Sequence, residues 1–316
     1  MRRLALLLCL PLLSCTAGRS IGALHHPDLQ LHQLATGAEG SGALFSSYQT
    51  GGPVRWNQEW PWKLDLSGVA WDKPNTATVI TPRHVVMAAH YIRPAGQQLV
   101  FHDRTGSRHA RTVQKVVKLS DRGLSCDVAI GLLDRPLPKS IRAYPLPSPR
   151  EDGGAALVGA TALVTEQKRT LYFHQIRNTA PGWLHFRFDE RIPESRRKNL
   201  IKGDSGHPSF LLSKGELLLL ETHTGGGSGS GPFYGDAGLQ EKMREVIREL
   251  DPEHTFRTIE IDQRTLDDAE SGRAAIPERE RPKPPQQQPA ARPGQPQPDP
   301  AGPRRPRPRV VLPPNP

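Results

Sequence analysis

Three short segments of this chain hold a histidine, an aspartate and a serine in settings that suit nucleophilic catalysis. His90 ends the strand-like run 80–90 after two alanines, and Asp127 leads directly into the apolar run 128–133. Ser205 lies between glycines in a Gly-Asp-Ser-Gly sequence. A serine hydroxyl needs a base to take its proton, and a histidine base works best when a carboxylate fixes its tautomer. Together the three residues predict acyl transfer, with Ser205 as the attacking group.

Each segment has a plainer interpretation when it is taken alone. A histidine at a strand end is often structural, an aspartate before a strand often belongs to a turn, and Gly-Asp-Ser-Gly can be only a tight loop. However, an aspartate that enters a buried strand requires a partner, because an unpaired buried charge is costly. Glycines also let backbone N–H groups converge on one point, as an oxyanion requires. The order His, Asp, Ser, with gaps of 37 and 78 residues, makes the joint signal far more specific.

From about residue 42 to residue 250, the chain resembles the chymotrypsin/trypsin-like serine endopeptidase family. The segment 80–90 resembles the family strand that ends in Ala-Ala-His, 127–130 resembles its Asp-Ile-Ala-Leu stretch, and 203–208 resembles its Gly-Asp-Ser-Gly-Gly-Pro loop. The chain order also matches this family and differs from that of subtilisin and the α/β-hydrolases.

The resemblance implies a role for each residue of the constellation. Ser205 would be the nucleophile, His90 the general acid and base, and Asp127 the orienting carboxylate, while the N–H groups of Gly203 and Ser205 would form the oxyanion hole. No metal or organic cofactor is implied, and the substrate would be a protein or peptide. His84 precedes Val-Val, as does the catalytic histidine of a more distant, high-temperature-requirement branch, but the Ala-Ala-His spacing favours His90.

The chain departs from the family pattern around the serine. There is no Arg or Lys followed by Ile-Val-Gly-Gly, so activation by a newly cut amine is not expected. Asp204 is therefore predicted to pair with an internal cation or with hydrogen-bond donors. His207 replaces the second glycine of the family loop.

The residues expected to bind substrate are Asn199, Thr222, His223 and Thr224. Asn199, six residues before the serine, stands where many relatives have the base of the specificity pocket, and it is not an acid. Cleavage after Arg or Lys is accordingly disfavoured. The Thr-His-Thr run resembles the lining of bacterial glutamyl endopeptidases, which favours acidic side chains. His223 can equally be a strand residue that points elsewhere, and small or uncharged side chains are then the preferred expectation.

Short strand-like runs predict an all-β fold of two packed antiparallel β-barrels with a C-terminal helix. They are rich in β-branched and aromatic residues and are separated by turn residues. The expected strands are 64–71, 76–80, 84–87, 97–102, 112–119, 128–133, 155–164, 171–176, 182–188, 208–212 and 217–222. The run 239–250 has a helical apolar face and ends before Asp-Pro.

The N-terminus has the features of an export signal. Two arginines precede a ten-residue apolar stretch, and no apolar run in the chain is long enough for a transmembrane helix. Leu-Leu-Ser-Cys at 12–15 resembles a bacterial lipobox, which implies lipidation of Cys15 and anchoring in the bacterial cell envelope. The alternative is an ordinary signal cut near Ala17, with secretion of the protein.

The C-terminal tail carries much of the unusual composition. Of 316 residues 32 are proline, and 15 of these lie in 277–316, where eight basic and three acidic residues supply half of the net charge of +10. The body is thus nearly neutral and gives little reason to expect nucleic-acid binding. The tail is predicted to be disordered, either a plain solvated linker or an adhesive arm with an unknown partner.

These features divide the chain into six expected parts. They are a signal peptide (1–14), an N-terminal linker (15–41), a first barrel (42–140), a second barrel with the helix (141–252), an extension of uncertain structure (253–276) and the tail (277–316). The predicted function is that of an exported serine endopeptidase. The alternative is an inactive module of the same shape that binds a surface polymer or a protein.

Overall fold

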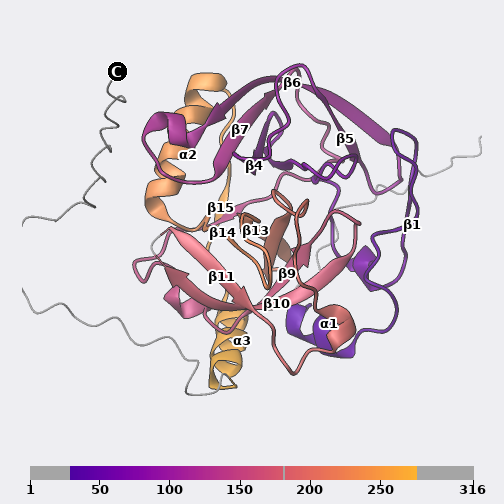
Figure 1. Ribbon diagram of the computed structural model, residues 1–316, viewed down its shortest axis with the longest axis vertical. Coiled ribbons are helices and arrows are strands. Elements are labelled where there is room, and N and C mark those ends of the chain that lie inside the picture. Colours follow the sequence, from indigo (N-terminus) through magenta and orange to yellow (C-terminus); the bar gives the residue numbers. More distant parts are fainter. Residues whose placement is uncertain (1–28, 181, 276–316) are drawn as a thin grey trace, which may run out of the picture. The chain divides into compact units, whose positions relative to one another are not determined.

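The computed structural model describes residues 29–180 and 182–275, which form a mostly β protein with two curled antiparallel sheets and a few helices (Figure 1). The all-β fold class predicted from the sequence is confirmed. The predicted signal peptide, Cys15, and the Pro/Arg-rich tail lie outside the described residues.

The first curled sheet has five strands and carries the segments around His90 and Asp127. Its order is β3 (Thr78–Thr81), β4 (His84–Ala88), β7 (Val128–Leu133), β6 (Arg108–Lys118) and β5 (Gln98–His102). The strands β4 and β7 are buried throughout, as their nearly continuous apolar sequences require. Ala88 pairs with Val128, so the residues that follow β4 lie beside the residues that precede β7.

The second curled sheet has six strands. Its order is β13 (Glu216–Thr222), β12 (Pro208–Ser213), β9 (Thr161–Thr165), β10 (Leu171–Ala180), β11 (Trp183–Arg187) and β14 (Ser230–Pro232). A core cluster of buried side chains includes Val86 and Ile130 from the first sheet and Leu163, Phe173 and Phe210 from the second. The two sheets therefore share a continuous apolar core.

Short elements complete the fold. Two-stranded pairs join β1 (Phe45–Ser47) to β2 (Arg55–Trp56), and β8 (Leu146–Pro147) to β15 (Thr258–Ile259). The 3-10 turns are η1 (Trp60–Lys63), η2 (Leu119–Arg122), η3 (Ala155–Leu157) and η4 (Glu194–Arg196). The predicted helix is present as α2 (Ala237–Leu250), and Asp236 caps it by accepting a hydrogen bond from the N–H of Leu239.

One strand prediction was wrong and another was wrong in part. The run 64–71 is not a strand: it bends at Gly68, where a Cβ would lie 1.9 Å from the Arg142 carbonyl oxygen, and it buries its apolar side chains from a loop. In the run 155–164 the chain first forms η3 after Gly154, which has a φ of +86°, and β9 begins only at Thr161. Periodicity alone does not distinguish a buried loop from a buried strand.

Two helices were not predicted. Within the expected linker, α1 (Leu31–Gly37) buries Leu31, Leu34 and Ala35. Within the uncertain extension, α3 (Gln263–Ala274) follows β15 and is capped by Asp262. Each helix is short or weakly amphipathic, so packing against the second sheet rather than its own sequence stabilises it.

Candidate active site

His90 and Asp127 lie side by side at the end of the first sheet. The Nδ1 atom of His90 is 2.6 Å from Oδ2 of Asp127, and the backbone N–H of His90 donates to Oδ1 of the same carboxylate at 2.9 Å. The His90 side chain is about half exposed, whereas that of Asp127 is mostly buried. This double contact fixes the imidazole, leaves Nε2 as the nitrogen available for chemistry, and gives Asp127 the partner that its position requires.

The loop that carries Ser205 lies against the strand that leads to His90. A Cβ on Gly206 would be 3.5 Å from the backbone nitrogen of Ala88, two residues before His90. The Gly206 N–H donates to the His223 carbonyl at 2.8 Å, which fixes the loop on the chain after β13. Within the described chain the Ser205 hydroxyl makes no hydrogen bond. Bonds between nucleophile and base are often formed only when substrate is present.

The backbone around Ser205 suits an oxyanion hole. Gly203 and Gly206 have φ angles of +101° and +84°, a region that favours glycine. Among the hydrogen bonds of the described residues, neither the N–H of Gly203 nor that of Ser205 donates to a protein acceptor. These two donors are therefore available for a bound oxygen.

Asp204, beside the serine, is held by internal groups, as predicted. Its carboxylate accepts hydrogen bonds from the N–H groups of Ile201, at 2.8 Å, and Gln167, at 3.2 Å. The Lys198 ammonium lies 3.9 Å from Asp204 and also binds the fully buried carboxylate of Glu166. The turn between β9 and β10, which carries Glu166 and Gln167, thus fixes the position of the loop before Ser205.

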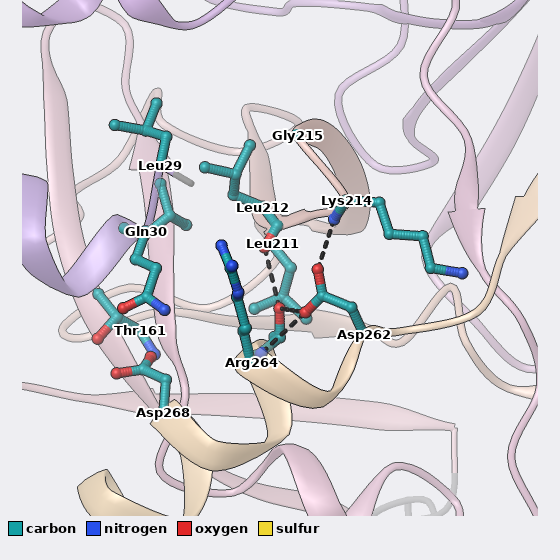
Figure 2. A pocket seen from close by; sticks show the side chains of 12 residues that line it. Leu29, Gln30, Thr161, Leu211, Leu212, Lys214, Gly215, Asp262, Arg264 and Asp268 are labelled. Carbon is teal, nitrogen blue, oxygen red and sulfur yellow. Dashed lines mark hydrogen bonds between the residues drawn. The ribbon is translucent and has the colours of Figure 1, made fainter. Parts of the chain in front are cut away.

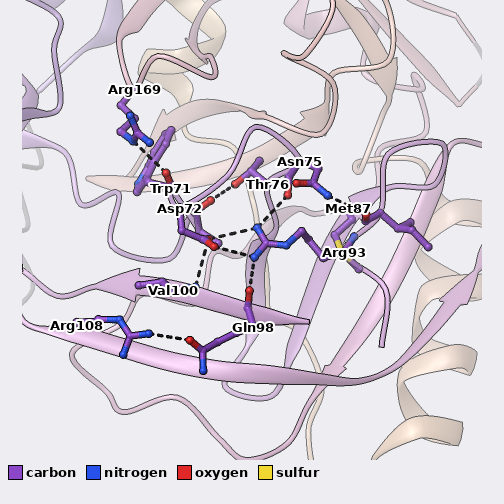
Figure 3. Close-up of polar contacts among 12 residues, drawn as sticks. Trp71, Asp72, Asn75, Thr76, Met87, Arg93, Gln98, Val100, Arg108 and Arg169 are labelled. Carbon is purple, nitrogen blue, oxygen red and sulfur yellow. Dashed lines mark hydrogen bonds and ion pairs between the residues drawn. The ribbon is translucent and has the colours of Figure 1, made fainter. Parts of the chain in front are cut away.

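A buried ion pair fixes a second loop, 71–76, which lies beside His207 of the serine loop. Arg93 is fully buried and binds both carboxylate oxygens of Asp72, which fixes the loop 71–76 (Figure 3). The ring of Trp71 from this loop lies beside the ring of His207, with centroids 5.8 Å apart. Burial lowers the pKa of His207 to about 3, so this ring is neutral at pH 7. His207 is 1% exposed, so the added bulk of its ring is buried beside Trp71 and not open to solvent.

The residues predicted to bind substrate occupy different environments. Thr222 and His223 are buried, and the Thr222 hydroxyl lies 2.9 Å from that of Tyr234. The two His223 ring nitrogens face the Thr165 carbonyl, at 3.0 Å, and a Glu221 carboxylate oxygen, at 2.7 Å.

Burial opposes the charged form of His223, but Glu221 outweighs this effect and raises the pKa of His223. The positions of Thr222 and His223 therefore argue against direct contact with a substrate side chain.

Thr224 and Asn199 differ from these two buried residues. The Thr224 hydroxyl donates to Asp127 at 2.8 Å, so Thr224 belongs to the His90–Asp127 arrangement. Asn199 is exposed and lines a cavity of about 160 Å³ with Phe188, Glu194, Arg197 and Lys198. It does not lie at the base of an enclosed pocket.

Leu200, the residue after Asn199, is buried and paired with the chain that follows Thr224. Its backbone N–H and carbonyl both bond to Gly227, at 2.7 and 3.0 Å, which joins the segment before the serine to the segment after Thr224. The Leu200 side chain is 3% exposed and packs against Gly229, where a Cβ would be only 2.8 Å from it. The sequence signals this contact only by a leucine after Asn199, because the pairing with Gly227 joins segments that are distant along the chain.

An open groove of about 430 Å³ borders His90. Its lining includes His90, Lys118, Cys126 and Asp127 from the first sheet, and Trp183 from the second. The groove lies on the Cys126 and Trp183 side of the imidazole, and Ser205 is not among the described residues that line it. By contrast, the cavity beside α3 shown in Figure 2 has a volume of about 20 Å³, room for roughly one water molecule, and it lies between Asp262 and the start of α1.

One group of potential metal ligands occurs among the described residues. Asp251, Glu253 and His254, after α2, bring their ligand atoms within 4.8 Å of one another. Arg83 and His254 already bind the Asp251 carboxylate, so the group is accounted for by ion pairing. None of the described helices is long and apolar enough to span a bilayer.

Comparison with models of known protein families and with curated proteins finds no match to this sequence. The two curled antiparallel half-barrel sheets are nevertheless compatible with a chymotrypsin-like fold.

Proposed function

We propose that this protein is a serine endopeptidase that cleaves peptide bonds through an acyl-enzyme. The observation that carries the proposal is the contact of His90 Nδ1 with the Asp127 carboxylate at 2.6 Å, beside the loop of Ser205. The similarity of three sequence segments to the trypsin-like family supports the same conclusion.

In the proposed reaction, His90 Nε2 takes the proton of the Ser205 hydroxyl as its oxygen attacks the peptide carbonyl carbon. The negative charge moves to the carbonyl oxygen, where the N–H groups of Gly203 and Ser205 stabilise it. His90 then gives its proton to the leaving amine as the C–N bond breaks. Water, activated by His90, attacks the ester and releases the acid, which restores the serine.

Lys198 and Asp204 support the further proposal that no activating cleavage is needed. In the activation mechanism expected of the family, a new N-terminal amine pairs with the aspartate before the serine. Here two backbone N–H groups and the Lys198 ammonium already surround Asp204. The loop therefore has its counter-charge within the folded chain.

The test of the proposed function is hydrolysis of a mixed peptide library by the full chain and by its Ser205→Ala variant. Cleavage by the wild type alone supports the proposal. Absence of cleavage and of active-site labelling in the folded wild type would instead favour an inactive module that binds a polymer or protein in the groove beside Trp183.

We also propose that the enzyme is exported and held in a bacterial envelope through lipid on Cys15. Two or three acyl chains give firm attachment, whereas a single chain gives only marginal binding. Cys15→Ala should move the protein from the membrane fraction to the soluble fraction, and an unchanged distribution would contradict the anchoring.

A further inference from the structure

The helix α1 packs on the second sheet, although the first sheet follows it in the sequence. It contacts β9 and β10, and its side chains Leu31, Leu34 and Ala35 are buried in the shared core. His32 adds a contact of 3.3 Å between its Nδ1 and the hydroxyl of Thr161 on β9. The segment before the first barrel is therefore part of the structure that carries Ser205.

Arg196 joins α1 to the segment that leads to the serine. Its Nη1 donates to the Leu34 carbonyl at 2.9 Å, its Nη2 donates to the Ala38 carbonyl, and its guanidinium lies 5.4 Å from the centroid of the Trp60 ring. The Leu34 carbonyl also accepts a 3.3 Å hydrogen bond from the N–H of Ala38, so the guanidinium adds a second donor to Leu34 and bonds the carbonyl of Ala38, which lies just past the helix end. One rigid guanidinium can bond both carbonyls at once, which an ammonium does less well.

The anchored segment continues to the oxyanion loop through further fixed points. Arg196 ends η4, and Lys198, two residues later, binds Glu166 and approaches Asp204. The Lys198 backbone N–H also faces Nε2 of His174 at 3.4 Å. The segment from Arg196 to Gly203 is thus held at short intervals, and Arg196 attaches it to α1.

We propose that Arg196 is a positioning residue through which α1 holds the segment 197–204 in the conformation that presents the N–H groups of Gly203 and Ser205. The proposal rests on the proposed function. In this arrangement the N-terminal segment must stay attached to the folded protein for full activity. Cleavage near residue 40 that detaches α1 should therefore lower the activity. In a zymogen, cleavage at this place would raise the activity instead.

The test uses full-length Arg196→Met. The rate of covalent labelling by a fluorophosphonate, and kcat and KM on a cleaved peptide, are compared with the wild type. We expect labelling and kcat to fall about tenfold or more, the effect of losing a charge-assisted hydrogen bond, with KM changed less than about threefold. Arg196→Lys should give intermediate rates.

The matched control is Arg244→Met. Arg244 likewise bonds an acceptor, Gln240, and lies over an aromatic ring, that of Phe256, but it belongs to α2. It should keep the wild-type labelling rate.

A second pair of variants decides the matter if Arg196→Met does not fold. Leu34→Ala loosens α1, whereas Leu99→Ala removes an equally buried leucine from the first sheet. We expect slower labelling in folded Leu34→Ala only. The proposal is overturned if folded Arg196→Met labels at the wild-type rate. If Arg196→Met does not fold, a wild-type labelling rate in Leu34→Ala overturns it. Failure of the wild-type protein to label would instead overturn the proposed function.

Discussion

The hydroxyl of Thr224 donates a 2.8 Å hydrogen bond to Oδ2 of Asp127, the same oxygen that lies 2.6 Å from Nδ1 of His90. Thr224 follows β13 in the second sheet, whereas Asp127 precedes β7 in the first. One carboxylate oxygen therefore joins the two halves of the fold at the candidate site. It also fixes the direction in which the carboxylate faces the imidazole.

Replacement of Thr224 by valine tests this relationship, because it keeps the shape of the side chain and removes the donor. A hydrogen bond to a charged group contributes about 1.5–3 kcal/mol, so kcat/KM should fall roughly 10- to 100-fold. Thr224→Ser, which retains the hydroxyl, should stay within about threefold of the wild type. Equal rates for the valine and serine variants, measured on one peptide substrate, would show that the bond has no role in orienting His90.

Activity without proteolytic processing is expected from the contacts of Asp204. Purified full-length protein should hydrolyse peptides at once, and limited proteolysis near residue 40 should not raise its rate. Lys198→Met should lower kcat/KM, because it leaves the buried Glu166 carboxylate without its cation and removes the cation near Asp204. N-terminal sequencing of the active species provides the check. An enzyme that is inert until cut near residue 40 would refute the expectation.

We expect a preference for small side chains before the cleaved bond, because the Leu200 side chain is buried against Gly229 next to Asn199, the residue expected to bind that side chain. Alanine, serine or glycine should be preferred, and arginine or lysine should be poor. Leu200→Gly should open the space and raise kcat/KM for phenylalanine relative to alanine by about tenfold, since added apolar contact in a pocket gives about 1–3 kcal/mol. A library of peptides that differ at this one position measures both. Strong cleavage after arginine or lysine by the wild type would contradict this account of the pocket.

Acid should destabilise the protein through His207. Its pKa in the folded state is about 3, against an ordinary 6.5, so between these values the unfolded chain binds more protons. The free energy of unfolding should therefore decrease as the pH falls from about 6.5, by up to about 1.4 kcal/mol per pH unit for this residue. His207→Gln should lose less stability than the wild type between pH 7 and pH 5, as measured by urea unfolding. Parallel losses in the two proteins would exclude His207 as a source.

Most strands and the candidate catalytic segments could be predicted from the sequence because their signals are local. The run 128–133 is apolar throughout and became β7, and Asp127 stands directly before it. The fixed spacing of Ala-Ala-His and the glycines around Ser205 also lie within a few residues of each other. A side chain that directly follows or precedes a strand can therefore be placed from the local sequence pattern alone.

The partners across the fold could not be predicted, because they depend on how distant segments pack. Glu166 lies 32 residues before Lys198, and no short pattern joins them. The neighbours of His223 in the sequence leave open whether its ring faces the substrate or points elsewhere, and the ring lies against Glu221. The helix α1 is seven residues long and exists because the second sheet buries one of its faces.

The most direct test of the central claim is labelling of the folded full chain with a fluorophosphonate, followed by mass spectrometry of its peptides. The reagent reacts with a serine that a neighbouring base has activated and whose oxyanion is stabilised. We predict one adduct, on Ser205, that is lost in Ser205→Ala and strongly slowed in His90→Ala. No adduct on the folded protein, or an adduct on another serine with Ser205 unmodified, would contradict the account.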